Sequence, residues 1–282
     1  MTPPVSLMVR LAAGTPNDAL LKLTADMAAR LAAARVIGIS ARQPMPIYGS
    51  PDMYAPPELS TWDSEQIDRE LKAAEKEFRF ALEGKVAALE WRSTVVTYGS
   101  IADYVAEQMR AADLLITGAH EGGALLDRSR YVNVADLVLR AGKPVLVAAS
   151  SQDKVDLRTV VVGWKDTREA RRAVQDAVPL LRLAERVIVV EIAATDDLAE
   201  ARTRTQDVAD WLVRHGIAAS ARAVPATAGE AVQLRNIASD LEFDAGLLVG
   251  GAYGHTRFRE WVLGGVTRDF LLQPVRCSLV SH

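Results

Sequence analysis

An internal repeat constrains the fold of this chain more than any other feature. Segment 113–120 reads Asp-Leu-Leu-Ile-Thr-Gly-Ala-His, and it aligns with segment 246–253, which reads Gly-Leu-Leu-Val-Gly-Gly-Ala-Tyr. The apolar segment 6–10 aligns with 159–163 in the same order along the chain. Because the units of solenoid proteins are only about 20–50 residues long, a repeat of this length predicts two tandem domains.

Each half of the chain alternates short apolar runs with longer amphipathic segments. Runs of about four to eight apolar residues indicate buried parallel strands, and the longer segments indicate helices. In the first half we expect strands at 5–9, 35–40, 89–96, 114–118 and 144–148, and helices at 17–33, 64–84, 100–109 and 133–140. In the second half we expect strands at 159–162, 186–191, 218–224, 246–249 and 275–280, and helices at 167–183, 196–215, 227–241 and 266–272. This alternation predicts an α/β fold of two tandem doubly wound parallel-sheet domains, with helices on both faces of each sheet.

The two domains are expected at residues 1–152 and 157–282, and the first carries an insertion. Residues 43–62 contain five prolines, which disfavour a regular helix or a central strand. We therefore expect this insertion to be a surface segment outside both sheets. Helix caps are expected at Asn17 or Asp18, at Thr167 and at Thr227.

Composition argues against several classes of protein. The chain has 282 residues, of which 49% are hydrophobic and 24% charged, so each domain can bury a core of its own. The net charge of −3, with both signs interspersed, argues against a nucleic-acid partner. No apolar run is long enough to span a bilayer and the N-terminus lacks a signal-peptide pattern, so we expect a cytoplasmic protein without a membrane partner. The single cysteine, Cys277, lies in an expected strand and is interpreted as a small buried apolar residue.

A set of spaced glycines follows the strand expected at 246–249. Two residues separate Gly251 from Gly254, and nine separate Gly254 from the pair Gly264-Gly265. Glycines at the end of a strand and at the start of a helix allow backbone N–H groups to come close to a phosphate. Ligands of doubly wound folds bind at the carboxyl ends of the strands, where this loop is expected.

This spacing resembles the nucleotide loop of the universal stress protein family, Gly-x2-Gly-x9-Gly-Ser/Thr, and the resemblance covers the whole chain as two copies. It implies small cytoplasmic α/β domains of the adenine-nucleotide alpha-hydrolase-like fold, with strand order 3-2-1-4-5. It also implies that the two domains pair with each other face to face, in imitation of the family's homodimer. A homodimer of the whole chain is left open. Many members of the family bind ATP, and others do not.

The second copy departs from the ATP-binding pattern at two places. Gly265 stands where the ATP-binding members carry Ser or Thr, so a hydroxyl donor is missing although the backbone N–H remains. Lys165 falls on the position of an acidic residue after the first strand, and Asp166 follows it. Asp166 either reaches a ribose or adenine, or serves as an acid near the start of a helix. Lys165 either meets a phosphate or is solvated, and Trp164 either covers a base or packs in the core.

Further candidates lie within the glycine loop. Val266 and Thr267 are preserved after the glycine pair, and Thr267 offers a hydroxyl. Arg257 offers a charge and His255 a hydrogen bond, although each can instead be an ordinary surface residue. The expected ligand is ATP with Mg, bound weakly. The candidate nucleotide site comprises Gly251, Gly254, His255, Arg257, Gly264, Gly265, Val266, Thr267, Lys165 and Asp166.

The first copy departs further from the pattern. Glu121 replaces the second glycine, and Val132-Asn133 replaces Gly264-Gly265. Because Glu121 would place a negative charge beside the phosphates, we interpret this copy as a structural partner without a nucleotide site.

No catalytic or metal-binding residue can be assigned. The sequence contains no P-loop, no dinucleotide fingerprint and no nucleophile elbow, and its four histidines have no metal-site spacing with the cysteine. Three hypotheses therefore stand. The first is a stress-response binding module with at most one weak nucleotide site, in the second domain. The second is an interaction protein of the same fold that binds no nucleotide, and the third is a slow ATPase.

Overall fold

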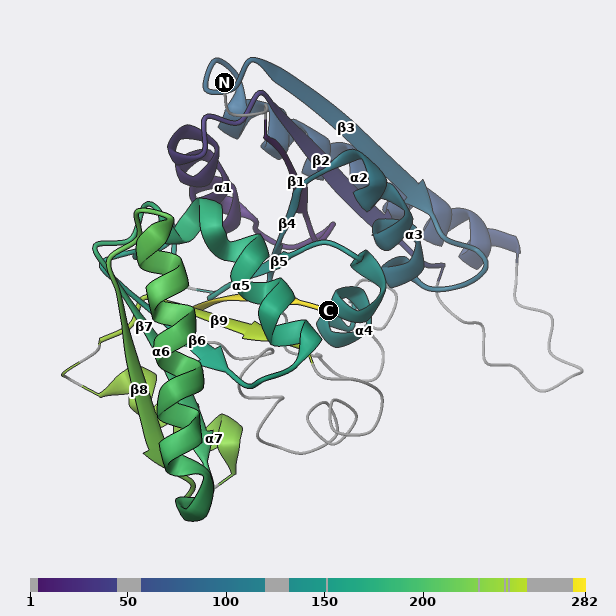
Figure 1. Cartoon of the computed structure of the whole chain (residues 1–282). Coiled ribbons are helices and arrows are strands. Elements are labelled where there is room, and N and C mark those ends of the chain that lie inside the picture. Colours follow the sequence, from purple (N-terminus) through teal and green to yellow (C-terminus); the bar gives the residue numbers. More distant parts are fainter. Residues whose placement is uncertain are drawn as a thin grey trace, which may run out of the picture.

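A computed structural model describes residues 5–44, 57–119, 132–150, 152–227, 229–240, 242, 244–252 and 276–282. Strands and helices alternate along both halves of the chain (Figure 1). The first half contains β1 (Ser6–Arg10), α1 (Asp18–Arg30), β2 (Arg35–Arg42), α2 (Pro57–Leu82), β3 (Ala88–Val95), α3 (Ile101–Gln108), the 3-10 turn η1 (Met109–Ala111), β4 (Leu114–Gly118), α4 (Val134–Ala141) and β5 (Val145–Ala148). The second half contains β6 (Thr159–Trp164), α5 (Arg168–Leu181), β7 (Arg186–Ala193), the 3-10 turn η3 (Thr195–Asp197), α6 (Leu198–Arg214), β8 (Ala219–Pro225), α7 (Glu230–Ser239), β9 (Leu247–Gly251) and β10 (Cys277–Ser281).

The strands form one ten-stranded sheet in the order β3-β2-β1-β4-β5-β10-β9-β6-β7-β8. Counted within each half, the order is 3-2-1-4-5, and the second half repeats it in the opposite direction across the sheet. The described strand pairs within a half are all parallel. The predicted α/β class, the doubly wound topology and the strand order are therefore confirmed.

The halves meet edge to edge, and not face to face as the resemblance implied. β5 and β10 pair antiparallel, with Leu146 opposite Leu279 and Val145 opposite Val280. Each of these strands would be the exposed edge of its own half-sheet, with a row of unpaired N–H and C=O groups. Their pairing satisfies those groups on both sides, which explains why the two half-sheets continue into each other.

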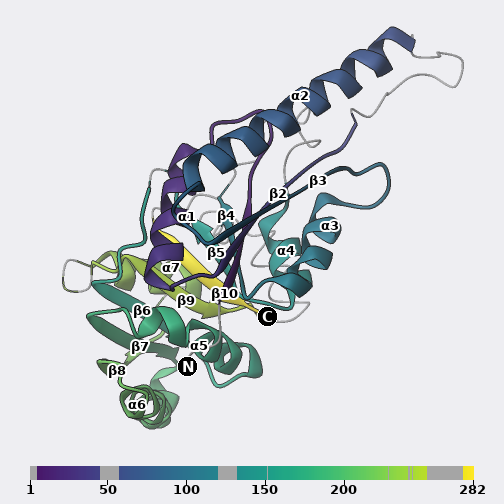
Figure 2. The ribbon, with the colours of Figure 1, turned by 90° about the horizontal axis from the view of Figure 1, so that it is seen from above.

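Helices cover both faces of the sheet. In the first half, α1 and α2 lie on one side of the strands, and α3 and α4 lie on the other (Figure 2). One buried cluster runs through both halves, because it contains Met27 of α1 and Leu181 of α5 as well as residues of the central strands. The connector between the halves also belongs to this cluster, since Val155 is fully buried and Leu157 is only 4% exposed.

The insertion is shorter than expected, because its last residues are helical. α2 begins at Pro57, whereas the sequence predicted a helix only from Ser64. A proline is tolerated in the first turn of a helix, since its missing N–H would have no partner there. Gln43, at the other end of the insertion, donates from Nε2 to the carbonyl of Gly99 at 2.8 Å. Residues 45–56 lie outside the described part of the chain.

Of the three predicted helix caps, one is confirmed, one is confirmed in position only, and one differs. Asn17 is the N-cap residue of α1, but its side chain makes no cap hydrogen bond, because its Oδ1 accepts from the N–H of Ala12 at 3.1 Å within the preceding loop. The residue at the N-cap of α7 is Gly229, and not Thr227. Thr167 caps α5 as expected, with its Oγ1 accepting from the N–H of Ala170 at 3.3 Å.

Cys277 is fully buried in β10, as predicted. Its thiol donates to Oε1 of Gln152 at 3.1 Å, and burial raises the pKa of the thiol to about 11. The thiol is therefore protonated and unreactive at neutral pH.

Candidate functional site

The candidate site lies where β6 and β9 end, at the carboxyl edge of the second half. These strands are neighbours in the sheet, with Gly163 opposite Gly250. The chain leaves β6 towards α5 and β7 on one side, while β10 lies on the other side of β9. This point, at which the strand order reverses, is where doubly wound sheets bind their ligands. Gly251 and Lys165 lie at this edge, and the site as a whole stays a prediction.

Gly251, the last residue of β9, is packed against the start of α5. A Cβ atom at this position would lie 2.5 Å from the carbonyl carbon of Glu169 and 2.6 Å from the backbone N of Ala170. Both neighbours are backbone atoms, so they cannot move aside cheaply. At the neighbouring Gly250, no atom of the described residues lies within 4 Å of the same position. Gly251 is thus required by the close approach of a helix, independently of any ligand.

A buried carboxylate at this edge was not singled out from the sequence. Glu169, in the first turn of α5, is only 8% exposed and forms an ion pair with Arg168 at 2.5 Å. Burial opposes its ionisation, but hydrogen bonds from Arg168 and from its own backbone N–H, with the nearby charges of Arg168 and His282, hold its pKa below the usual value. An acid two residues after the cap Thr167 was the available sequence signal, since the N-terminus of a helix favours negative charge.

The end of the chain closes the same edge. The N–H of Ala252 donates to the carbonyl of Ser281 at 2.7 Å, and Nδ1 of His282 lies 2.9 Å from the carbonyl oxygen of Ala252. These contacts join Ala252, the residue after β9, to the end of β10.

The segment after β6 shows Asp166 in an ion pair with a residue of α5. Asp166 contacts Arg171 at 2.5 Å, and both side chains are more than half exposed. Lys165 is half-buried, and its carbonyl accepts from the N–H of Thr167 at 2.7 Å. Trp164 is half-buried and packs against the cluster shared by both halves. The sequence left two roles open for Asp166, a contact with a ribose or adenine and an acid near the start of a helix. Its described contacts are those of the second role, an acid paired with a residue of α5.

The structure thus describes three of the ten candidate residues, Gly251, Lys165 and Asp166, at the ends of β9 and β6. The other seven lie outside the described residues: Gly254, His255, Arg257, Gly264, Gly265, Val266 and Thr267. The helix predicted at 266–272 lies in the same part of the chain.

The corresponding edge of the first half is closed by its own side chains. Asn133, which aligns with Gly265, caps α4: its Oδ1 accepts from the N–H groups of Ala135 at 3.0 Å and Asp136 at 3.4 Å. These are the donors that a helix N-terminus would offer to an anion. The loop after β1 is likewise held by Asn17, and Arg10 at the end of that strand is only 2% exposed.

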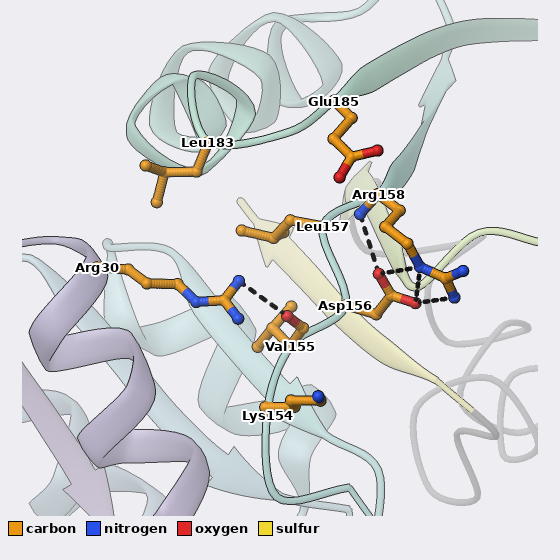
Figure 3. A pocket seen from close by; sticks show the side chains of 8 residues that line it. All are labelled: Arg30, Lys154, Val155, Asp156, Leu157, Arg158, Leu183 and Glu185. Carbon is orange, nitrogen blue, oxygen red and sulfur yellow. Dashed lines mark hydrogen bonds and ion pairs between the residues drawn. The ribbon is translucent and has the colours of Figure 1, made fainter.

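A cavity of about 420 Å³ lies at the opposite, amino edge of the sheet, where the connector enters β6. Figure 3 shows Arg30 of α1 on one side of this cavity, and Leu183 and Glu185, which follow α5, near its other side. Nη1 of Arg30 donates to the carbonyl of Val155 at 3.1 Å, and Arg158 forms an ion pair with Asp156 at 2.6 Å. Because these cations already bind the connector, we interpret the cavity as part of the joint between the halves.

Two kinds of feature are absent from the described part of the chain. No group of three or more His, Cys, Asp or Glu side chains is arranged to hold a metal ion. Among the same residues, no helix combines the length and the apolar character needed to cross a membrane.

No family model and no curated protein matches the sequence. Solved structures match over nearly its whole length. A universal stress protein from Archaeoglobus fulgidus has a TM-score of 0.68 at 13% identity, covering 98% of this chain and 97% of that protein. A candidate universal stress protein from Pseudomonas aeruginosa has a TM-score of 0.60 at 16% identity, covering 99% and 93%. A functionally unknown protein from Pseudomonas aeruginosa has a TM-score of 0.55 at 16% identity, covering 99% and 92%. The chain therefore has the fold of the universal stress proteins, over both of its halves.

Proposed function

We propose that this chain is a tandem member of the universal stress protein family. Its role would be a stress-response binding module with at most one weak adenine-nucleotide site, located in the second half. The observation that carries the proposal is the placement of Gly251 at the reversal point of the strand order, beside the end of β6. The glycines that follow in the sequence have the spacing of the family's nucleotide loop.

The restriction to one site is supported by the cap of α4. In the first half, Asn133 already accepts hydrogen bonds from the helix N–H groups that a phosphate would need. At the aligned position in the second half, Gly265 has no side chain to act in this way. If the helix predicted at 266–272 forms, an anion could approach its start without displacing a side chain of residue 265.

The weakness of the site is inferred from two lost contacts. Gly265 supplies no hydroxyl, and the acid expected after β6 is displaced by one residue to Asp166, which is paired with Arg171. Each lost polar contact costs about 1 kcal/mol, so the two together weaken binding roughly thirtyfold.

One observation favours the alternative of an interaction protein that binds no nucleotide. Gly251 is explained by its packing on α5, and the buried carboxylate of Glu169 lies next to it. A negative charge at this edge opposes the approach of a phosphate. A titration can separate the two functions.

The test is calorimetric titration of the full chain with ATP and magnesium. We expect weak binding by the wild type, tighter binding by Gly265→Ser, and a further gain when Lys165→Asp and Asp166→Gly are added. Gly254→Glu, which copies the first half, should abolish binding. Asn133→Gly is the matched control in the first half, and it should add no second site because Glu121 remains.

Two outcomes would contradict the proposal. Tight binding by the wild type would show that the two departures from the family pattern cost little. An absence of binding in the triple variant Gly265→Ser, Lys165→Asp and Asp166→Gly would favour the interaction protein. Native mass spectrometry of the freshly purified chain would show independently whether a nucleotide accompanies it.

A further inference from the structure

The sheet ends in a free edge on each side, as far as the described residues show. β3 forms one end of the strand order and β8 the other, and Figure 1 shows β3 at the outer margin of the first half. A strand at the edge of a sheet offers unpaired N–H and C=O groups to another chain. Every residue of β3 is at least partly exposed, so this edge is open to a partner.

The backbone contacts of β3 show which of its residues face outwards. The N–H of Val96, directly after the strand, donates to the carbonyl of Arg42 in β2 at 2.8 Å. Because the backbone groups of successive residues point to opposite sides of a strand, the even-numbered residues of β3 are those that bond to β2. The odd-numbered residues therefore present their N–H and C=O groups at the free edge: Leu89, Trp91, Ser93 and Val95.

β8, at the other end of the sheet, is a poorer edge for pairing. The N–H of Ala226 donates to the carbonyl of Ala193 in β7 at 2.8 Å, so the odd-numbered residues of β8 face outwards. Pro225 is one of them, and it has no N–H to donate. Arg222 is the single charged residue of this strand, so two copies of β8 cannot form opposite-charge pairs with each other.

The charges of β3 are self-complementary about Trp91, which Glu90 and Arg92 flank. If two copies of β3 pair antiparallel with Trp91 opposite Trp91, Glu90 of each copy lies directly opposite Arg92 of the other. A register centred on Glu90 or on Arg92 instead places like charges opposite each other. Opposite charges directly across an antiparallel pair stabilise it, and like charges destabilise it. The charge pattern therefore favours a second copy of this chain, in the register centred on Trp91.

These charges are held in position within the single chain. Glu90 forms ion pairs with Arg92 at 2.7 Å and with Arg35 of β2 at 3.2 Å. The side chain of Arg92 also donates to Oε1 of Gln108, at the end of α3, at 2.8 Å. Glu90 is nevertheless 38% exposed and Arg92 21% exposed, so both remain accessible to a second copy. Little side-chain freedom is then lost when the copies pair.

The other face of β3 carries apolar side chains. Trp91 packs on Phe78 of α2, with ring centroids 5.5 Å apart, and Leu89 packs against the same cluster. Both Leu89 and Trp91 are only half-buried in the single chain. In the register centred on Trp91, the two indole rings become cross-strand neighbours and Leu89 lies opposite Ser93. Aromatic cross-strand pairs stabilise a sheet, so pairing also covers apolar surface.

We propose that two copies of the whole chain associate through β3, antiparallel and in the register centred on Trp91. The same surface is used on both copies, so the contact closes at a dimer, whereas a contact between β3 and β8 would continue into an open fibre. The two ten-stranded sheets then form one continuous sheet. Within the chain, the edges of the half-sheets are already joined by an antiparallel pair, β5 with β10. This inference does not depend on the proposed nucleotide site.

The test is sedimentation equilibrium of the full chain over a range of concentrations. We expect a monomer–dimer equilibrium with a dissociation constant on the order of 100 μM, because one strand from each copy forms a contact smaller than the roughly 1,200 Å² of stable complexes. Ser93→Pro removes an outward-facing N–H without removing a bond to β2. It should weaken association more than tenfold while the circular dichroism spectrum stays that of the folded chain. Ala223→Pro, at an outward-facing position of β8, is the matched control and should associate like the wild type.

Charge variants test the register independently of the proline variants. Glu90→Lys leaves two cations beside Trp91, and Arg92→Glu leaves two anions, so each variant alone should associate about fivefold more weakly than the wild type. An equimolar mixture restores both opposite-charge pairs between unlike copies. The mixture should therefore form a heterodimer with an affinity near that of the wild type. A purely structural effect of either substitution would persist in the mixture.

Three results would overturn the proposal. The first is a wild-type chain that stays monomeric at ten times the expected dissociation constant. The second is equal weakening by Ser93→Pro and Ala223→Pro, or growth beyond a dimer, either of which would indicate contacts between β3 and β8. The third is a mixture of the two charge variants that associates no better than each variant alone, which would reject the register centred on Trp91.

Discussion

At the end of β9, two neighbouring glycines have different surroundings. The Cβ position of Gly251 is blocked by the backbone of α5, whereas that of Gly250 meets no atom of the part of the chain that the structure describes. A glycine in a ligand loop and a glycine needed for packing look the same in a sequence. Only the contacts of the folded chain distinguish the two roles. In this protein they show that Gly251 is needed for the packing of α5 against β9.

We predict that Gly251→Ala destabilises the protein by about 1–3 kcal/mol, because the added methyl group forces α5 away from the sheet. Gly250→Ala should be neutral or slightly stabilising, since it lowers the entropy of the unfolded chain without a clash against the described residues. Urea unfolding of the full chain measures both. Equal stabilities of the two variants would show that α5 can move without cost.

Ion pairs at the residue scale repeat between the halves with reversed sign. Arg42, the last residue of β2, pairs with Glu70 of α2 at 3.2 Å, and both side chains are buried. In the second half, Glu191 near the end of β7 pairs with Arg204 of α6 at 2.6 Å. In the first half the strand carries the cation and the helix the anion, and in the second half the reverse holds. Both halves therefore keep an ion pair between their second strand and their second helix, although the residue types differ.

At the scale of elements, α3 and α4 are joined through the cap of α3. Asp103 N donates to Oγ of Ser100 at 3.0 Å, and Oγ of Ser100 donates back to Oδ2 of Asp103 at 2.7 Å. The same carboxylate forms an ion pair with Arg140, near the end of α4. The hydrogen bond from Ser100, aided by the charge of Arg140, holds the pKa of Asp103 below its ordinary value of 3.8.

We predict that Asp103→Asn lowers the free energy of unfolding at pH 7 by about 1 kcal/mol, as expected for a lost cap. A lowered pKa in the folded state stabilises the protein above the unfolded-state pKa, and this contribution is lost as the pH falls through the folded-state pKa. The difference between wild type and variant should therefore shrink below about pH 4. Asp68→Asn, which removes an exposed i,i+4 pair with Lys72, is the control and should change stability by less than about 0.5 kcal/mol. A difference that persists unchanged at pH 3 would contradict the role of the charge.

At the scale of the whole molecule, the two halves are continuous in two ways. The sheet runs through the β5–β10 pair, and one buried cluster includes helices of both halves. Their strands nevertheless stay grouped, because no strand of one half lies between strands of the other among the ten that are described. The proposed boundary, with domains at 1–152 and 157–282, remains a prediction.

We predict that fragments 5–149 and 157–282 each fold with a mixed α/β circular dichroism spectrum. Each fragment would expose its fifth strand as a free edge, so each should form homodimers, and a mixture should form the heterodimer. Analytical ultracentrifugation of the separate and mixed fragments measures this association. Unfolded fragments would mean that the shared cluster makes the chain a single cooperative unit.

The types and order of the elements could be predicted from the sequence because they depend on local patterns. The apolar run 114–118 coincides with β4, and Thr167 caps α5 as its residue type predicts. The repeat indicated two copies, and the glycine spacing indicated a fold whose strand order the sheet confirms. These signals are local, or they recur along the chain, so a single sequence carries them.

Only the tertiary structure decided how the copies join and which side chains meet. The antiparallel pairing of β5 with β10, the burial of Val155 in the connector and the approach of Trp164 and Trp211 to one cavity all join distant parts of the chain. The free energy of such contacts depends on shape and on the partners available in space. Local periodicity carries no record of either, so the sequence alone predicts the two halves but not the joint between them.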